Sequence, residues 1–327
     1  MLPWSHRHRR RLLPFNPSSP PLPPPPPPLL LSRLHCRERL LVNPVYWTNR
    51  QLELLQCSFN DPSPAPPTTQ SNFTGERNGR WFIGRMFRIW KLGCRRGQIL
   101  NIVSYSDCPL DNWENLRFFF NGRFRGHLKC NALFLRGDTS APLIAAYVDR
   151  QQLELLRDEA LRPRLRRKQG RSIAFALFKI RLKSITPTEP LHDPYIAALL
   201  IAVAQRQHLV ALEQQGYESE RNCILTFSPQ VLVSSKDKEC MHLYTADISS
   251  SFLEMLIRPD VPPPAPTSIS IQITVVPYKP YNTLRDRLFA LLLPPQSQDV
   301  DRKRKIGDEG TQHLPNKHEA EELITCP

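Results

Sequence analysis

Six consecutive prolines at residues 23–28 constrain the start of this chain more than any other feature of its sequence. Proline fixes φ and has no backbone N–H to donate, so such a run fits neither a helix interior nor the middle of a sheet. The chain has 34 prolines in 327 residues, about twice the usual share of roughly 5%, and they cluster. We therefore expect residues 1–70 to be a disordered, Pro-rich basic segment that precedes the folded part.

The Pro-rich segment contains two short patterns of the kind that docking domains bind in the polyproline II conformation. Arg11, Pro14 and Pro17 spell R-x-x-P-x-x-P, a pattern typical of SH3 ligands. Leu22 and the prolines after it resemble an EVH1 or profilin target. These patterns predict docking sites, and a solvated tail with no dedicated partner is the alternative.

Charge and cysteine usage bear on partners and location. The formal net charge of +14 favours attraction to nucleic acid or an anionic membrane surface. The 8 cysteines contain no C-x-x-C pair, which is typical of a reducing compartment and favours nucleus or cytoplasm. No acidic residue precedes Glu38, so a mitochondrial transit peptide is an alternative, although the prolines oppose its helix. The apolar run at residues 195–204 falls short of the roughly 20 residues that cross a bilayer.

Residues 71–170 are predicted to be a poorly defined basic and aromatic region that ends in a helix. Aromatic residues at 81–90 interleave with cations that helical spacing would gather on one solvated face: Arg85, Arg88, Lys91 and Arg95. A membrane-bound helix, a calmodulin-type ligand and a stacking surface for single-stranded nucleic acid are the alternatives. Residues 149–160 predict a helix with Leu153 and Leu156 facing inward. The basic run at 162–168 indicates an exposed connector, or a nuclear-import or phosphate-contact patch.

Four residues of this region are candidate zinc ligands: Cys94, Cys108, His127 and Cys130. Structural zinc sites usually use two close pairs of ligands, and Cys94 and Cys108 are widely separated. We therefore do not expect a metal site here.

Residues 171–293 predict a compact α+β module with a mixed sheet. Residues 172–182 alternate in a way that predicts a strand, and Asp193 with Pro194 opens a helix that ends at Gly216. Residues 223–233 and 240–246 predict an antiparallel hairpin.

The second half of this module is predicted to be a helix, a strand and a closing helix. Ser251 and Glu254 match a capping box for a helix that ends at Ile257, and residues 268–276 alternate as a half-buried strand. Thr283 and Asp286 match a second capping box. The closing helix has an apolar face that consists of Leu284, Leu288, Leu291 and Leu292. The predicted order is β-α-β-β-α-β-α.

Three strings in this module, at residues 193–200, 242–248 and 277–281, are similar to a family of uncharacterised proteins from filamentous fungi. The resemblance covers roughly residues 185–293. It implies no activity, fold or functional residue.

The sequence contains no Gly-rich phosphate loop, G-x-S-x-G or H-E-x-x-H motif, so we expect no enzyme, cofactor or metal site. A degenerate nuclease-like fold is one alternative, but its [D/E]-x-K pair is missing from every predicted strand, and Asp247 and Glu254 are expected to be cap residues. We expect a non-enzymatic protein-interaction module. Nucleic-acid binding through the basic runs is the second alternative.

Residues 294–327 predict a disordered charged tail. Its cations Arg302, Lys303, Arg304 and Lys305 form a candidate nuclear-import run. The alternative is a solvated tail in which nearby acidic residues balance these charges.

Overall fold

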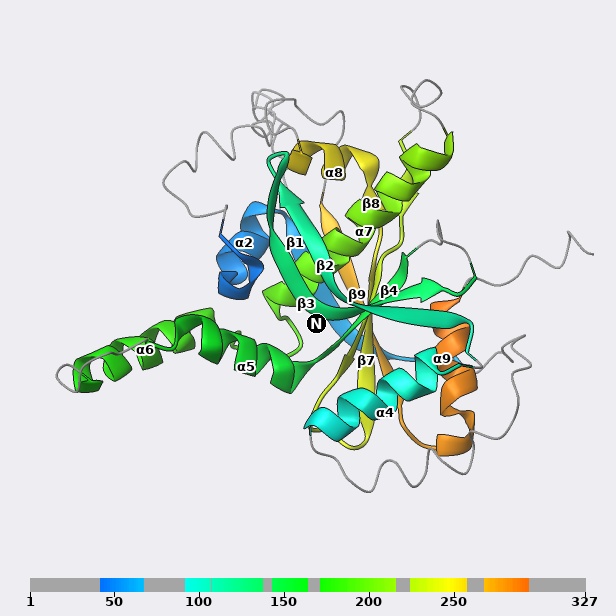
Figure 1. Ribbon diagram of the computed structural model, residues 1–327, viewed down its shortest axis with the longest axis horizontal. Coiled ribbons are helices and arrows are strands. Elements are labelled where there is room, and N and C mark those ends of the chain that lie inside the picture. The colour runs from blue at the N-terminus through cyan, green and yellow to red at the C-terminus, as the bar shows by residue number, and fades with distance from the viewer. Residues whose placement is uncertain are drawn as a thin grey trace, which may run out of the picture.

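The computed structural model describes residues 42–67, 92–106, 108–137, 143–163, 171–215, 224–257 and 268–293. These residues form a seven-stranded mixed sheet in the order β1-β9-β7-β6-β4-β3-β2 (Figure 1). The strands are β1 (Cys57–Pro64), β2 (Leu110–Phe120), β3 (Arg123–Leu135), β4 (Leu143–Asp149), β6 (Gln230–Ser234), β7 (Cys240–Ala246) and β9 (Ile269–Pro277). The β1–β9 and β4–β6 pairs are parallel, and the other neighbours are antiparallel. The protein therefore has the predicted α+β class with a mixed sheet.

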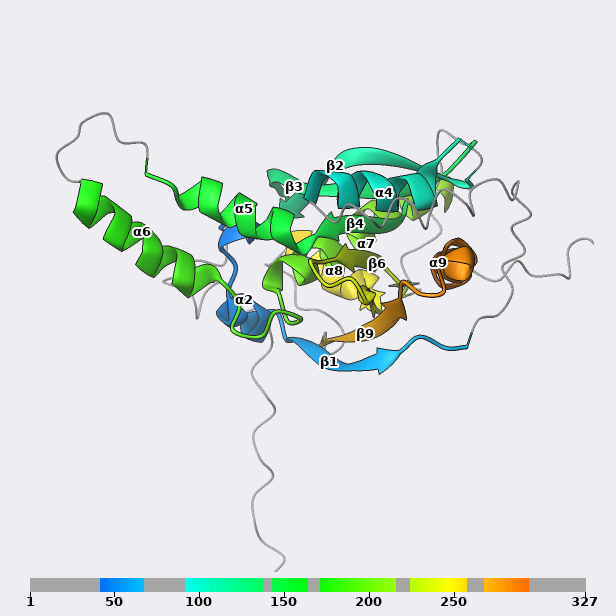
Figure 2. The same cartoon turned by 90° about the horizontal axis from the view of Figure 1, so that it is seen from below.

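Helices cover both faces of the sheet (Figures 1 and 2). One face carries η1 (Pro44–Tyr46), α2 (Asn49–Leu54), α5 (Arg150–Leu161), α7 (Pro194–Gln215) and α8 (Ser250–Ile257). The other carries α4 (Leu92–Ser104), η3 (Tyr281–Thr283) and α9 (Leu284–Leu292). A second ladder pairs β5 (Thr226–Phe227) with β8 (Ile248–Ser249), and α6 (Arg171–Ile185) extends away from the sheet.

Helix α7 forms the centre of the first face. Asp193 accepts a hydrogen bond from the backbone N–H of Tyr195 at 2.9 Å, and Pro194 occupies the first helical position, as predicted. Residues 195–204 are all buried against the sheet. By length and composition alone α7 resembles a membrane span, but 72% of its apolar window is buried within the protein. This helix is therefore a core element.

The second face is closed by α4 and α9. Leu284, Leu288 and Leu292 are buried, which confirms most of the predicted apolar face, whereas Leu291 is half-buried. They pack with Ile99 and other residues of α4 over the alternating side chains of the sheet. Each fully buried aliphatic side chain contributes about 1.5–3 kcal/mol relative to an exposed one.

The prediction of a strand at residues 172–182 is wrong, because α6 covers these residues. Their apparent alternation is incomplete, since Ala174, Ala176 and Phe178 fill the positions that a half-buried strand would leave polar. Ala, Leu, Lys and Arg are also strong helix formers. The predicted element order fails at its first member for this reason.

The predicted boundary near residue 171 does not divide the sheet. Strand β6, from the predicted module, pairs with β4, and β9 pairs with β1. Residues assigned to a poorly defined region form α4, β2, β3, β4 and α5. Strands that are far apart in the sequence meet in one sheet. The difference in composition between the two halves of the chain therefore did not predict the limits of the folded unit.

The first 70 residues also contribute to the folded part. Helix α2 and strand β1 both lie within the segment that was expected to be disordered, and β1 extends through Asp61, Pro62 and Pro64. Pro62 and Pro64 are tolerated there because β1 is an edge strand. Residues 1–41 lie outside the described residues.

A tight hairpin joins β2 and β3. Asn121 and Gly122 have φ angles of 55° and 60°, and Phe120 pairs with Arg123 across them. An Asn-Gly pair is suited to this turn because both residues accept positive φ. The hairpin builds the sheet edge opposite β1.

Neither predicted capping box forms as expected, although Thr283 occupies the predicted N-cap position of α9. Ser249, not Ser251, accepts a hydrogen bond from the backbone N–H of Phe252, at 3.2 Å. Thr283 precedes α9 but makes no side-chain cap bond; its hydroxyl donates to the carbonyl of Pro280 at 3.2 Å. The boundaries of both helices nevertheless lie within two residues of the prediction.

Candidate interaction surface

Helices α5 and α6 pack against each other and project from the body of the protein in both views (Figures 1 and 2). We call this pair the arm. Its root is the start of α5, which follows β4 directly. The arm is the candidate functional site for two reasons. Its root is fixed to the core, and α6 exposes an apolar surface.

A buried ion pair fixes the root of the arm. Asp149 ends β4 and caps α5, since its Oδ1 accepts from the backbone N–H of Gln151 at 2.9 Å. The guanidinium of Arg95 donates to the same carboxylate through Nε at 2.5 Å and Nη2 at 2.7 Å, and neither side chain is exposed. This bidentate geometry joins α4, β4 and α5 at one point.

Two hydroxyls complete this polar cluster. Ser234 donates to Asp149 Oδ2 at 2.6 Å, and its own oxygen lies 2.8 Å from the hydroxyl of Tyr147. Burial lowers the pKa of Arg95, but the hydrogen bond and charge of Asp149 outweigh it, so the pKa is raised. Burial raises the pKa of Tyr147. The cluster is therefore an ionic and hydrogen-bonded anchor within the core.

A second buried ion pair holds the middle of α5. Arg157 donates to Asp193 through Nη1 at 2.9 Å and Nη2 at 2.5 Å. Both side chains are almost fully buried, and Asp193 also caps α7. The arm is thus attached to the sheet through Asp149 and to the core helix through Asp193.

Helix α6 has two apolar faces. The inner face consists of Ala174, Phe178, Leu182 and Ile185, which are half-buried or buried. A second face carries Ile173, Leu177 and Ile180, which are 70%, 50% and 65% exposed. At about 100° per residue these three side chains form one row, which we call the outer stripe.

Exposed cations lie on both sides of the outer stripe. Arg181 follows Leu177 by four residues, and Lys183 follows Ile180 by three, so each is a surface neighbour of the stripe. On the helix circumference they fall on opposite sides, with Lys179 beyond Lys183. Helix α6 contains no Asp or Glu. The surface therefore combines an apolar row with positive borders.

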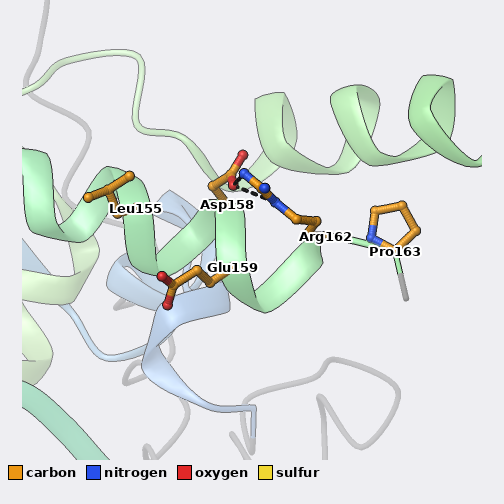
Figure 3. A pocket seen from close by; sticks show the side chains of 5 residues that line it. All are labelled: Leu155, Asp158, Glu159, Arg162 and Pro163. Carbon is orange, nitrogen blue, oxygen red and sulfur yellow. Dashed lines mark hydrogen bonds and ion pairs between the residues drawn. The ribbon is translucent and has the colours of Figure 1, made fainter. Parts of the chain in front are cut away.

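The outward face of α5 is hollowed and mostly polar. A shallow pocket of about 300 Å³ is lined by Leu155, Asp158, Glu159, Arg162 and Pro163 (Figure 3). Asp158 pairs with Arg162 across one side of it, and Glu159 points to the other. Leu155 is 45% exposed.

A neighbouring pocket of about 260 Å³ continues from Leu155 and Glu159 towards the β2–β3 edge. Asn115 lies in its wall at a bulge in β2, with a φ of 68°. Arg96, also in the wall, donates to Glu114 at 2.9 Å and to Asn131 at 3.0 Å. Its guanidinium is therefore already paired within the protein.

The candidate zinc ligands are not brought together. Cys108 is buried on the face covered by α4 and α9, whereas Cys130 is buried on the α7 face. Cys94 and His127 are exposed on α4 and β3. Burial raises the pKa of Cys130 to about 12, which disfavours a thiolate. The part of the chain that the structure describes has no group of three or more His, Cys, Asp or Glu side chains suited to a metal ion.

The two carboxylates considered for a nuclease-like site have separate surroundings. Asp247 accepts a hydrogen bond from Ser228 at 2.8 Å, and Glu254 is exposed on α8. The Pro-motif residues Arg11, Pro14 and Pro17 lie outside the described residues. So do the import-run residues Arg302, Lys303, Arg304 and Lys305.

The sequence reasoning did not identify the arm as a surface. Arg95 was expected on a solvated face, yet it is fully buried as the partner of Asp149. The signal for the outer stripe was present as the spacing of residues 173, 177 and 180, but the strand interpretation hid it.

No protein-family model, curated protein or solved structure matches this chain. The resemblance of residues 185–293 to a fungal family stays a prediction. Function is therefore inferred from the surfaces of the chain itself.

Proposed function

We propose that this protein is a non-enzymatic interaction module that binds a partner protein through the outer stripe of α6. The observation that carries the proposal is the row of three exposed apolar side chains, Ile173, Leu177 and Ile180, on a projecting helix. Single exposed apolar residues are ordinary on protein surfaces, whereas a contiguous row is typical of an interaction site.

The anchoring of the arm supports this proposal. The ion pairs of Asp149 and Asp193 fix α5 at two points, and α6 packs on α5 through its inner face. A surface held in place before binding loses less conformational entropy when a partner docks. The outer stripe is thus presented by a preorganised scaffold.

Photo-crosslinking in cells that express the full-length protein tests this proposal. A photoreactive amino acid at Leu177 is expected to give one dominant protein adduct, and the same group at Glu254 on α8 is the control. The variant Ile173→Gln with Ile180→Gln is expected to remove the adduct, because it makes the stripe polar. The partner must then be purified and shown to bind the wild type but not this variant.

Nucleic-acid binding is the second candidate function, favoured by the exposed Lys179, Arg181 and Lys183. Such binding weakens steeply with salt, because each phosphate contact releases counterions. Nucleic-acid binding through these cations does not explain the exposed apolar side chains of the outer stripe, so we rank it second. Single-stranded DNA that binds equally to the wild type and the Ile173→Gln, Ile180→Gln variant would favour it over protein docking.

A further inference from the structure

We infer that the partner element that covers the outer stripe is an amphipathic helix with acidic residues on both sides of its apolar row. This inference rests on the proposed function, since it names the chemistry of the partner at the same site. Three features of α6 carry it: the spacing of the stripe, the charges beside it and the coverage of its inner face.

The spacing of the stripe matches the seam of a coiled coil. Ile173, Leu177 and Ile180 are separated by four and three residues, which is the alternation of a and d positions in a heptad. Ser184 follows after four more residues and ends the apolar row. A row one or two side chains wide fits the narrow contact between two helices.

The charges beside the seam select the partner. In a coiled coil the positions next to a and d face their counterparts on the other helix and set which helices pair. In α6 the two borders are occupied by Arg181 and Lys183, and Lys179 lies beyond Lys183; all three are exposed. A complementary helix must therefore place Glu or Asp on both sides of its own seam.

The same charges argue against a second copy of α6 as the partner. Two such helices would bring two sets of cations together with no carboxylate to pair with them, because α6 contains no acidic residue. Like charges at these positions destabilise a helix pair. The outer stripe therefore does not complement itself.

Coverage of the inner face limits the shape of the partner. Phe178, Leu182 and Ile185 are already half-buried or buried, and α6 contacts α5. A partner groove that encloses a whole helix therefore has no access to all sides of α6.

A membrane surface could reach the outer stripe. Helices that lie in a bilayer interface, however, have a broad apolar face and carry their charged residues on the opposite face. Phe175 is also 45% exposed, but on the helix circumference Lys179 and Lys183 lie between it and the outer stripe. With Arg181 on the other side, these cations limit the apolar outer face of α6 to a seam.

Two synthetic helical peptides of 21 residues test the inference against the full-length chain. Both carry the same Leu and Ile seam; one has Glu at its border positions and the other has Lys. Fluorescence anisotropy is expected to give a dissociation constant about tenfold lower for the Glu peptide. The charge variant with Lys179→Glu, Arg181→Glu and Lys183→Glu is expected to reverse this preference.

The stripe variant separates the two proposals. Ile173→Gln, Leu177→Gln and Ile180→Gln should weaken the Glu peptide at least tenfold while circular dichroism shows an unchanged fold. If this variant binds as the wild type does, the site of the proposed function is wrong. If the stripe variant fails but Glu and Lys peptides bind the wild type equally, the proposed function stands and the acidic partner is wrong.

Binding to vesicles of phosphatidylcholine and phosphatidylserine at a 70:30 ratio is the third measurement. Flotation of the wild type but not the stripe variant, with no binding of either peptide, would overturn the inference in favour of a membrane surface. Failure of both peptides and the vesicles to bind would overturn it as well.

Discussion

At the scale of single residues, the two buried ion pairs are the points on which the arm depends. Arg95 and Asp149 have no exposed surface, so water cannot solvate either charge in place of the ion pair. Such a pair adds little stability over a well-packed apolar pair, but removal of one member leaves the other charge buried and unpaired. Replacement of one member of the pair is therefore expected to destabilise the protein more than replacement of both.

The substitution Asp149→Asn tests this anchor. It keeps the side-chain size and an oxygen for the cap, but it removes the carboxylate charge that pairs with the guanidinium of Arg95. We expect a loss of about 3–5 kcal/mol in the free energy of unfolding, measured by urea denaturation.

The matched control is Glu53→Gln, which breaks the exposed pair between Glu53 and Arg50. Exposed pairs contribute little, because water solvates both charges. A shift of the same small size for Asp149→Asn and Glu53→Gln would contradict the anchoring role.

His242 on β7 predicts a specific pH dependence. Burial, and then the charge of Arg150, lower the pKa of His242 in the folded state, while Asp237 opposes them. The unfolded histidine has a pKa of about 6.5, so below that pH the unfolded state binds more protons. Stability should therefore fall as the pH drops from about 6.5 through the lowered folded-state pKa.

The variant His242→Gln isolates this contribution. Urea midpoints measured between pH 5 and pH 8 should decline less steeply at the acid end for the variant than for the wild type. Parallel curves for the two proteins would show that His242 titrates alike in the folded and unfolded states.

Sequence reasoning identified some single residues and missed others for physical reasons. Asp193 was recognised because a cap followed by proline is a local pattern. Arg95 was missed because its partner Asp149 is 54 residues away, and no local pattern reports such a contact. An arginine with no nearby acid is expected in solvent until the fold places an acid beside it.

At the scale of elements, α6 contributes surface and little core. Ile173, Leu177 and Ile180 contact solvent, so their replacement by glutamine, a good helix former, should change the unfolding free energy by less than about 1 kcal/mol. Leu153→Ala on α5 is the contrast, because Leu153 is 2% exposed. That substitution should cost about 2–5 kcal/mol.

Urea denaturation of both variants decides between a surface role and a structural role. A loss for the stripe variant as large as that of Leu153→Ala would show that the outer stripe packs within the protein.

Elements with a strong local pattern were predictable. Helix α7 has an uninterrupted buried run and a clear cap, and β9 alternates cleanly. Helix α6 was assigned as a strand because two apolar faces on one helix imitate alternation. The β2–β3 hairpin was missed, although Asn121 and Gly122 carried its turn signal.

At the scale of the whole molecule, the sheet order explains why the expected boundary near residue 171 falls within one sheet. Strand β4 lies between β3 and β6, so it joins the strands from the two halves of the chain. Strand β1 pairs with β9 across about 200 residues of sequence. Such pairings follow from the buried faces of the completed sheet, and contrasts of composition along the chain do not reveal them.

The fragment of residues 171–293, which corresponds to the compact module expected from the sequence, should not fold alone. It lacks β4, so one edge of β6 loses its partner, and α7 loses the strands β2 and β4 against which it packs. Its buried Asp193 also loses Arg157, which leaves an unpaired charge in the core. We expect poorly dispersed amide signals in its NMR spectrum.

A fragment of residues 42–293 is the control, because it contains every strand of the seven-stranded sheet and both buried ion pairs. Its spectrum should show wide amide dispersion, and its slowest hydrogen exchange should lie in β4, β6 and β7, which are interior strands of the sheet. Well-dispersed signals from residues 171–293 alone would show that β6, β7 and β9 form a stable sheet without β4. In that case α7 would need a cover for its apolar surface other than β2 and β4, and the two halves of the chain would be separate folding units.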